Sequence, residues 1–144
     1  MKKTAAGFTL IELIIVVGII GLLMLVAVPT FNAMRDNVAL KNSSQQIVST
    51  LRLAQNRAIT SQGGVQHSVQ FTTNSFIIFG GTAGSPTYST TYPLTGGIQI
   101  LSGGTTVTFA RLTGTTAATT IQVGFSSTKK QDIKIDATGN ITIL

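Results

Sequence analysis

The chain has no cysteine and a single histidine in 144 residues. Without cysteine it cannot form a disulfide or a cysteine-ligated metal site, and it cannot carry a lipid on a thiol. Charged residues make up only 10% of the composition, whereas Ser, Thr and Gly dominate the C-terminal two thirds. This balance is unlike that of a typical cytosolic enzyme and favours an exported protein with one modest domain.

Two of the basic residues, Lys2 and Lys3, stand at the start of the chain. Without them, eight basic side chains face four acidic ones, so the formal net charge falls from +6 to +4. A mild excess of this kind mainly keeps a protein soluble. It gives only weak support for an anionic partner such as a nucleic acid.

Side chains that could act as acids, bases or metal ligands are sparse in the C-terminal part: His67, Asp132 and Asp136. They form no catalytic triad, phosphate-binding loop or zinc-ligand spacing. His67 shares one face of an alternating segment with Val69, which is typical of a structural histidine. Lys134 lies between the two aspartates and can compensate their charge. We therefore expect no enzyme activity, no catalytic residue, no cofactor and no metal.

A long hydrophobic run, residues 8–28, contains only two polar residues, Thr9 and Glu12. At about 1.5 Å per residue, a helix of this length spans the roughly 30 Å hydrocarbon layer of a bilayer. Lys2 and Lys3 precede the run, so the positive-inside rule places the N-terminus in the cytoplasm. The run predicts a single-pass membrane helix with the C-terminal domain outside the cytoplasm.

A secretory signal peptide is the first alternative, because it also combines a basic start with an apolar middle. The run here is too long for such a peptide, and no small-x-small cleavage site follows Val28. The carboxylate of Glu12 within the run costs on the order of 3 kcal/mol on insertion scales. Its presence therefore indicates a function and a partner.

Residues 2–13, which read KKTAAGFTLIEL, resemble the type III signal sequence of type IV pilins and type II secretion pseudopilins. The resemblance rests on a glycine, an aromatic residue, a glutamate at a fixed offset and a continuous apolar run. It implies that prepilin peptidase cuts between Gly7 and Phe8 and methylates the new N-terminus of Phe8, so that residues 1–7 are a leader. A plain anchor helix with an accidental glutamate is the alternative.

The ammonium group that cleavage creates at Phe8 would be a full positive charge within a bundle of apolar helices. A carboxylate from a neighbouring subunit can neutralise it in such low-dielectric surroundings, and the resemblance assigns this assembly role to Glu12. The implied partners are other pilins or pseudopilins in a helical filament and an inner-membrane assembly platform. The implied location is the bacterial inner membrane and then the pilus or pseudopilus.

Three residues interrupt the predicted helix of residues 8–31: Gly18, Gly21 and Pro29. Proline costs about 3 kcal/mol in a helix interior, so we expect a kink or loosened turn around residues 27–31. The glycines also fit a second interpretation, in which small residues let neighbouring helices approach closely.

Residues 32–62 continue the helix with an amphipathic pattern. Apolar side chains recur at intervals of three, four and seven residues, and polar ones fill the opposite side. The predicted buried face consists of Leu40, Ile47, Leu51, Ala54 and Ala58. The helix is expected to end within residues 60–64, where Ser-Gln-Gly-Gly is a stop signal.

Residues 63–144 alternate short apolar-patterned segments with Gly, Ser and Thr turns, which is typical of an antiparallel sheet or small sandwich. The predicted strands are residues 65–71, 75–80, 98–101, 106–110, 119–125, 131–136 and 140–144. Ala137-Thr138-Gly139 suits the turn of the last hairpin. The predicted fold class is therefore α+β, a long N-terminal helix packed on an antiparallel β domain, as the resemblance to type IV pilins implies.

Residues 49–60, which read STLRLAQNRAIT, and the strand after them resemble the start of a GspH/FimT domain. In that group a helix of the form L-x-x-A-R-x-x-A-I leads into the first strand. The positions that fit are Leu51, Ala54, Ala58 and Ile59, whereas Gln55 stands where an arginine is common. The likeness extends over the later strands and implies a minor pilin or pseudopilin.

Residues 80–97 carry no charge and are rich in Ser, Thr, Gly and Pro. This composition predicts a long polar loop, and an inert solvated loop is the favoured interpretation. A filament-surface contact or an acceptor of O-linked glycans is the alternative.

DNA capture is a competing function, because some FimT-like minor pilins bind DNA through arginines near the C-terminal hairpin. This chain has Gly139-Asn140-Ile141-Thr142 at the matching turn, so those arginines are missing. The cations that could still form a phosphate-facing patch are Arg111, Lys129, Lys130 and Lys134. A DNA-binding minor pilin for DNA uptake is therefore the alternative function.

The favoured interpretation is a minor pilin or pseudopilin of a type IV pilus or type II secretion pseudopilus. A major subunit remains an open alternative. So does a calcium site at Asp132 and Asp136, like those of some pseudopilins.

Overall fold

The computed structural model describes residues 7–103 and 105–144, and it places the side chains of all of these except residues 26–30. Lys2, Lys3 and the rest of the predicted leader before Gly7 lie outside the described residues. The chain divides into two compact units, Met1–Asn37 and Val38–Leu144. The second unit contains the whole β domain.

One long helix, α1 (Leu10–Ile59), precedes the strands. It is helical through Pro29, and the predicted kink at Gly18, Gly21 and Pro29 stays a prediction. Beyond Ile59 the backbone of Ser61 turns into the left-handed region (φ 52°), and a short 3-10 turn, η1 (Gln62–Gly64), follows. The helix thus ends one residue before the range predicted for its end, residues 60–64.

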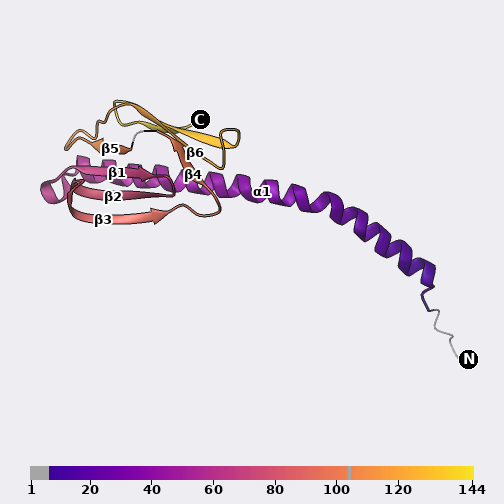
Figure 1. Ribbon diagram of the computed structural model, residues 1–144. Coiled ribbons are helices and arrows are strands. Elements are labelled where there is room, and N and C mark those ends of the chain that lie inside the picture. The colour runs from indigo at the N-terminus through magenta and orange to yellow at the C-terminus, as the bar shows by residue number, and fades with distance from the viewer. Residues whose placement is uncertain (1–6, 104) are drawn as a thin grey trace, which may run out of the picture. The chain divides into compact units, whose positions relative to one another are not determined.

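The eight described strands form two four-stranded antiparallel sheets (Figure 1). The first sheet has the order β3-β2-β1-β5, and the second has the order β4-β6-β7-β8. The strands are β1 (His67–Thr72), β2 (Ser75–Thr82), β3 (Ser85–Pro93), β4 (Gln99–Ser102), β5 (Thr106–Phe109), β6 (Thr119–Gly124), β7 (Lys130–Ile135) and β8 (Ile141–Ile143). The predicted α+β fold class is confirmed.

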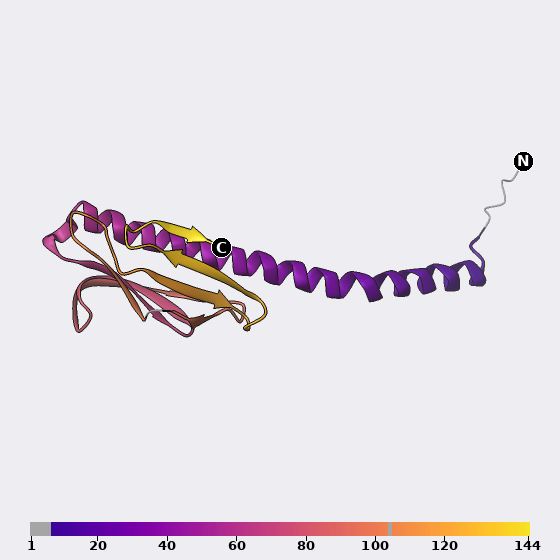
Figure 2. The same ribbon diagram turned by 90° about the horizontal axis from the view of Figure 1, so that it is seen from above.

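The amphipathic half of α1 carries the centre of the core. Ile47, Leu51, Ala54 and Ala58 are completely buried and Leu40 is 8% exposed, so the predicted face is confirmed. In Figure 2, β7 and β8 run beside this part of the helix, and the first sheet lies along it as well. The buried core residues whose side chains the structure describes lie between Leu40 and Ile141, so a fragment that starts at Arg35 contains all of these.

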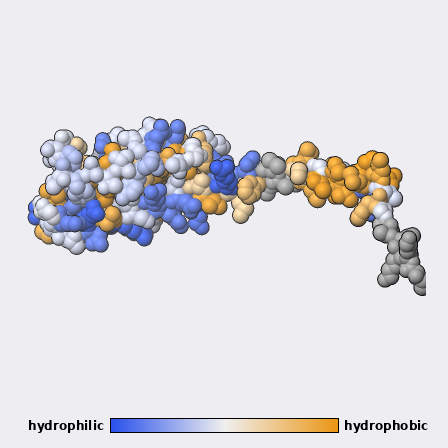
Figure 3. Space-filling model, turned by 90° about the horizontal axis from the view of Figure 1, so that it is seen from below, coloured by the Kyte–Doolittle hydropathy of each residue, from blue (hydrophilic) through white to orange (hydrophobic). Residues whose placement is uncertain are grey.

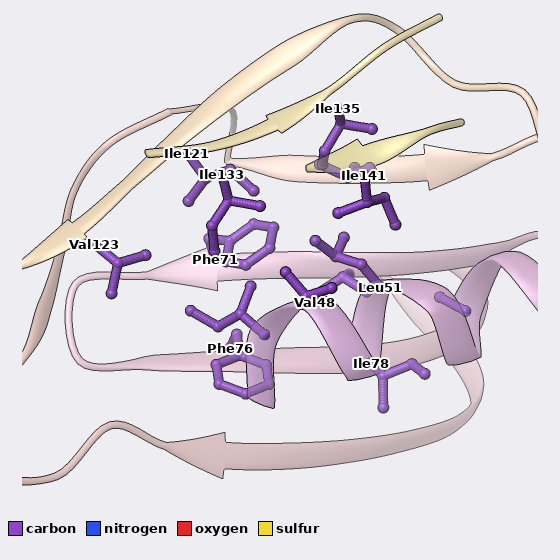
Figure 4. Close-up of a cluster of buried hydrophobic side chains, with 14 of the residues drawn as sticks. Val48, Leu51, Phe71, Phe76, Ile78, Ile121, Val123, Ile133, Ile135 and Ile141 are labelled. Atoms are coloured by element: carbon purple, nitrogen blue, oxygen red, sulfur yellow. The ribbon is translucent and has the colours of Figure 1, made fainter. Parts of the chain in front are cut away.

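Both sheets turn one apolar face toward the helix, as the alternation of their residues requires. In the first sheet Val69 lies opposite Ile78, and Phe71 lies opposite Phe76. Figure 4 shows side chains of both sheets, among them Phe76 and Ile133, meeting around the helix. Ile143 is an exception to the predicted pattern, because it is 38% exposed near the end of the chain.

The predicted loop at residues 80–97 is wrong, because most of it forms β3 and pairs with β2. Two tyrosines explain the error. Tyr92 stacks on Phe76 with ring centroids 5.3 Å apart, and the Tyr88 hydroxyl contacts His67. Thr and Tyr are good strand formers, so the lack of aliphatic residues and charges concealed a strand whose inward side chains are aromatic.

Candidate assembly site on the N-terminal helix

Thr9 caps the N-terminal end of α1. Its side-chain Oγ1 accepts a hydrogen bond from the backbone N–H of Glu12 (3.3 Å), and its carbonyl accepts one from the N–H of Leu13 (3.3 Å). A threonine followed three residues later by a glutamate is the capping-box signature. Thr9 was not among the predicted site residues, although its spacing from Glu12 could have identified it.

The Glu12 carboxylate lies in the first turn of α1 and is exposed. An acidic side chain there interacts favourably with the positive end of the helix dipole, by about 0.3–1 kcal/mol at an exposed position. An open hollow of about 240 Å³ lies beside it, with Phe8, Leu13 and Val16 on its walls. The carboxylate is thus presented at an apolar recess next to Phe8.

Large apolar side chains surround the N-terminal part of α1. Between residues 8 and 25 every one of them is at least 46% exposed, and Figure 3 shows the described part as an almost continuous hydrophobic surface. A helix that is hydrophobic all round has to be covered, by lipid or by other helices. Within the part of the chain that the structure describes, no helix is both long and apolar enough to cross a membrane.

Gly18 and Gly21 have open space around them. A Cβ atom added at either position would have no neighbouring heavy atom within 4 Å, the helix's own nearby backbone aside. Among the described residues nothing packs against either glycine, so the close-approach interpretation and the predicted kink both stay predictions.

The four cations considered for DNA binding lie in different places and are mostly engaged within the subunit. Arg111 follows β5 and donates hydrogen bonds to Ser61 Oγ (3.0 Å) and to the Gly64 carbonyl (2.8 Å). Lys129 and Lys130 lie where β7 begins, and Lys129 sits over the ring of Phe125 at 5.4 Å. Lys134, in β7, pairs with Asp136 at 3.8 Å. Arg111 thus ties the turn after β5 to the end of the helix.

His67 has a structural role, as predicted. It is completely buried, and its ring nitrogens contact the Tyr88 hydroxyl (2.7 Å) and the Gln62 carbonyl (2.9 Å). A carbonyl can only accept, so Nε2 donates to the Gln62 carbonyl, and Nδ1 shares a hydrogen bond with the Tyr88 hydroxyl. Both nitrogens are therefore satisfied by the fold.

Asp132 lies in β7 and Asp136 directly after it, and each has a polar partner within the domain. Asp132 accepts a weak hydrogen bond from Gln122 Nε2 (3.5 Å), and Asp136 has Lys134 as its ion-pair partner. Among the described residues, no three His, Cys, Asp or Glu side chains lie close enough together to hold a metal ion. Charge compensation accounts for Asp136, and no further ligands support the calcium alternative.

Gln55 links the helix to two loops of the second sheet, the loop before β6 and the turn between β7 and β8. Its Nε2 donates hydrogen bonds to the carbonyls of Gly114 (3.3 Å) and Gly139 (2.9 Å). Gly114 precedes β6, and Gly139 closes the turn between β7 and β8. This polar contact adds to the packing of Leu51, Ala54 and Ala58 in the core. The substitution of glutamine for the more common arginine was the signal that could have drawn attention to it.

Comparison with known families decides the relationship of the chain. Residues 2–28 match the prokaryotic N-terminal methylation motif, and residues 43–139 match the family described as type II transport protein GspH. The chain belongs to the GspH family. This family is described by a part in transport and not by a catalysed reaction, which agrees with the expectation that the chain is not an enzyme.

Two solved structures resemble the GspH-family chain in fold. The minor pseudopilin EpsH from the type 2 secretion system of Vibrio cholerae matches with a TM-score of 0.57 and 16% identity, over 73% of this chain and 95% of that one. The type IV minor pilin FimU of Pseudomonas aeruginosa matches with a TM-score of 0.56 and 15% identity, over 73% and 92%. At these identities the likeness concerns the fold alone. A comparison with curated protein sequences gave no match.

The predicted type IV pilin fold and the GspH/FimT family are thereby confirmed. The methylation motif covers Gly7, Phe8 and Glu12. The individual roles predicted for these three residues stay predictions.

Proposed function

We propose that the chain is a minor pilin or pseudopilin that enters a type IV pilus or a type II secretion pseudopilus through its N-terminal helix. The observation that carries this proposal is the contrast between the two units. Residues 38–144 enclose their own core, whereas the apolar side chains of residues 8–25 are exposed all round. A helix of that kind needs other apolar helices or lipid around it.

Processing by prepilin peptidase comes first in this proposal. Gly7 is exposed, and a Cβ atom added to it would meet nothing within 4 Å. The bond between Gly7 and Phe8 is therefore open to an enzyme. Cleavage there would remove residues 1–7, and methylation would leave Phe8 as the N-terminal residue with a positively charged amine.

The new amine needs a negative partner. It would stand beside the N-terminal end of α1, where the positive end of the helix dipole disfavours another positive charge. The backbone N–H of Glu12 is already bonded to Thr9, and its carboxylate is exposed. We assign the carboxylate to the amine of a neighbouring subunit, since an apolar bundle strengthens such a pair and penalises either charge alone.

Before assembly, the same apolar surface would hold the subunit in the inner membrane. The apolar run continues in the sequence from Leu25 to Val28, and Lys2 and Lys3 precede it. The proposal therefore places the β domain outside the cytoplasm, with an assembly platform in the membrane as the partner that extracts each subunit.

The decisive variant is Glu12→Gln, which keeps the size of the side chain and removes its charge. Asp36→Asn is the matched control, because it makes the same change further along the helix. We expect Glu12→Gln to be cleaved normally. Its amount in sheared filaments should be lower than that of the parent by a factor of at least about ten, because breaking a buried pair costs several kcal/mol. Equal incorporation of Glu12→Gln and Asp36→Asn would contradict the proposed role.

A further inference from the structure

The outer edge of β5 offers main-chain groups that no strand in the described part of the chain pairs with. In the pairing of β1 with β5, the N–H of Phe71 donates to the carbonyl of Thr105 (2.8 Å), and Val69 lies opposite Val107. Hydrogen-bonded and non-hydrogen-bonded positions alternate along an antiparallel pair. The main-chain groups of Val107 therefore point to β1, and those of Thr106 and Thr108 point away from it.

The chain itself covers only one end of this edge. The N–H of Ala110 donates to the carbonyl of Thr115 (2.8 Å). From there the chain leaves for the second sheet, where the N–H of Thr116 bonds to the carbonyl of Ala137 (3.2 Å) and Thr119 lies opposite Ile135. Residues 106–108 of β5 and residues 116–119 therefore lie on two sides of an open space.

That space is a hollow of about 290 Å³, equal to the volume of about ten water molecules. Its walls are residues 106–108 on one side and residues 116–119 on the other. The lining residues are threonines, alanines and one valine, and none is charged. An anion would find no cation here, and a metal ion would find no carboxylate.

The chemistry of the hollow matches an extended peptide. Thr106 and Thr108 are two residues apart, so their outward N–H and C=O groups repeat at about 6.6–6.8 Å, the period of a strand. The Thr108 hydroxyl accepts a hydrogen bond from Ser68 Oγ (2.9 Å). The main-chain groups of Thr108, which point away from β1, can therefore bond to a partner without disturbing this contact. Strand addition to a free sheet edge is a general mode of peptide recognition.

We propose that this hollow binds an extended, uncharged segment of a neighbouring filament subunit as an added strand on β5. The inference rests on the proposed function, because a filament is what brings such a segment beside the domain. The opposite edge of the same sheet provides the comparison. The Leu94 N–H donates to the Asn74 carbonyl (2.8 Å), so alternation turns the main-chain groups of Ser89 and Thr91 outward on β3.

Photo-cross-linking in filaments tests the inference. A photoreactive amino acid is placed at Thr106 or, as the matched control, at Ser89, in the full-length chain and in the cells that produce its filaments. We expect the Thr106 site to yield a cross-link to another subunit and the Ser89 site to yield at least about fivefold less, because residues 116–119 wall the hollow beside β5 and Ser89 lies at the opposite edge of the sheet. Equal yields, or none at Thr106 in filaments that contain the chain, would overturn the inference alone. Absence of the chain from filaments would overturn the proposed function as well.

Proline substitution at Thr108 supplies a second readout. It removes one outward N–H, together with the hydroxyl that accepts a hydrogen bond from Ser68 Oγ. The main-chain pairing of Val107 with β1 stays intact, since proline is tolerated where the N–H faces out of a sheet. With the photoreactive group kept at Thr106, Thr108→Pro should lower the cross-link yield by about fivefold, and Thr91→Pro should leave it unchanged. A yield unaffected by Thr108→Pro would refute strand addition.

Discussion

Gly139→Ala is expected to destabilise the domain far more than an ordinary glycine substitution. Gly139 is buried in the turn between β7 and β8, and its backbone has φ of 83°. A left-handed conformation costs a residue with a Cβ atom about 1–2 kcal/mol. The added Cβ would also collide with Gln55 Nε2 and with the Gly114 carbonyl oxygen.

The collision determines the size of the effect. Gln55 would have to move, and the carbonyls of Gly114 and Gly139 would both lose their hydrogen bond. An unsatisfied buried polar group costs about 1–3 kcal/mol, so strain and the two lost bonds together amount to about 3–8 kcal/mol. For a domain of this size, that lowers the melting temperature by at least about 12 °C.

Two other glycines separate the contributions. Gly96 also has positive φ (71°), but a Cβ there would have open space, so Gly96→Ala measures backbone strain alone. Gly84 has neither a positive φ nor a close neighbour, so Gly84→Ala should be neutral or slightly stabilising. Thermal unfolding of the fragment 35–144, followed by circular dichroism, ranks the three. If Gly139→Ala melted at the same temperature as Gly96→Ala, the Gln55 link would have no energetic weight.

Three further predictions follow from other contacts. Tyr88→Phe keeps the ring under Arg57 but removes the hydroxyl that is hydrogen-bonded to His67 Nδ1. Because a buried nitrogen then loses its partner, the free energy of unfolding in urea should fall by about 1–3 kcal/mol. An unchanged midpoint of urea unfolding would contradict this. Arg111→Ala should lower the stability of the fragment 35–144 by about 1–2 kcal/mol through the loss of its bonds to Ser61 and Gly64, and a purely surface residue would show no loss. The same fragment should bind duplex DNA negligibly at any salt concentration. A binding constant whose logarithm falls linearly with the logarithm of the salt concentration would favour DNA capture.

The helical half of the fold could be predicted because its signals are local. The apolar face from Leu40 to Ala58 repeats with the period of a helix, and the Ser-Gln-Gly-Gly stop lies where the helix ends. The strands with alternating aliphatic residues, such as Ile133 and Ile135, were also found. The division into two sheets was not, because nothing in the pattern of a single strand tells which distant strand it pairs with.

The proposed assembly site depends on a short motif, so Gly7, Phe8 and Glu12 could be named as candidates from the sequence. Contacts between distant segments were not. Gln55 donates hydrogen bonds to two glycines that follow it by 59 and 84 residues. The outward edge of β5 exists because β5 pairs with β1 on one side and is the last strand of its sheet. Such features arise only from the register of the folded chain.

The intact mass of the chain recovered from purified filaments is the most direct test of assembly through a processed N-terminal helix. We expect a chain that begins at Phe8 and carries one methyl group on its amine, with residues 1–7 absent. Recovery of a chain that begins at any other residue, or filaments that lack the chain altogether, would contradict it.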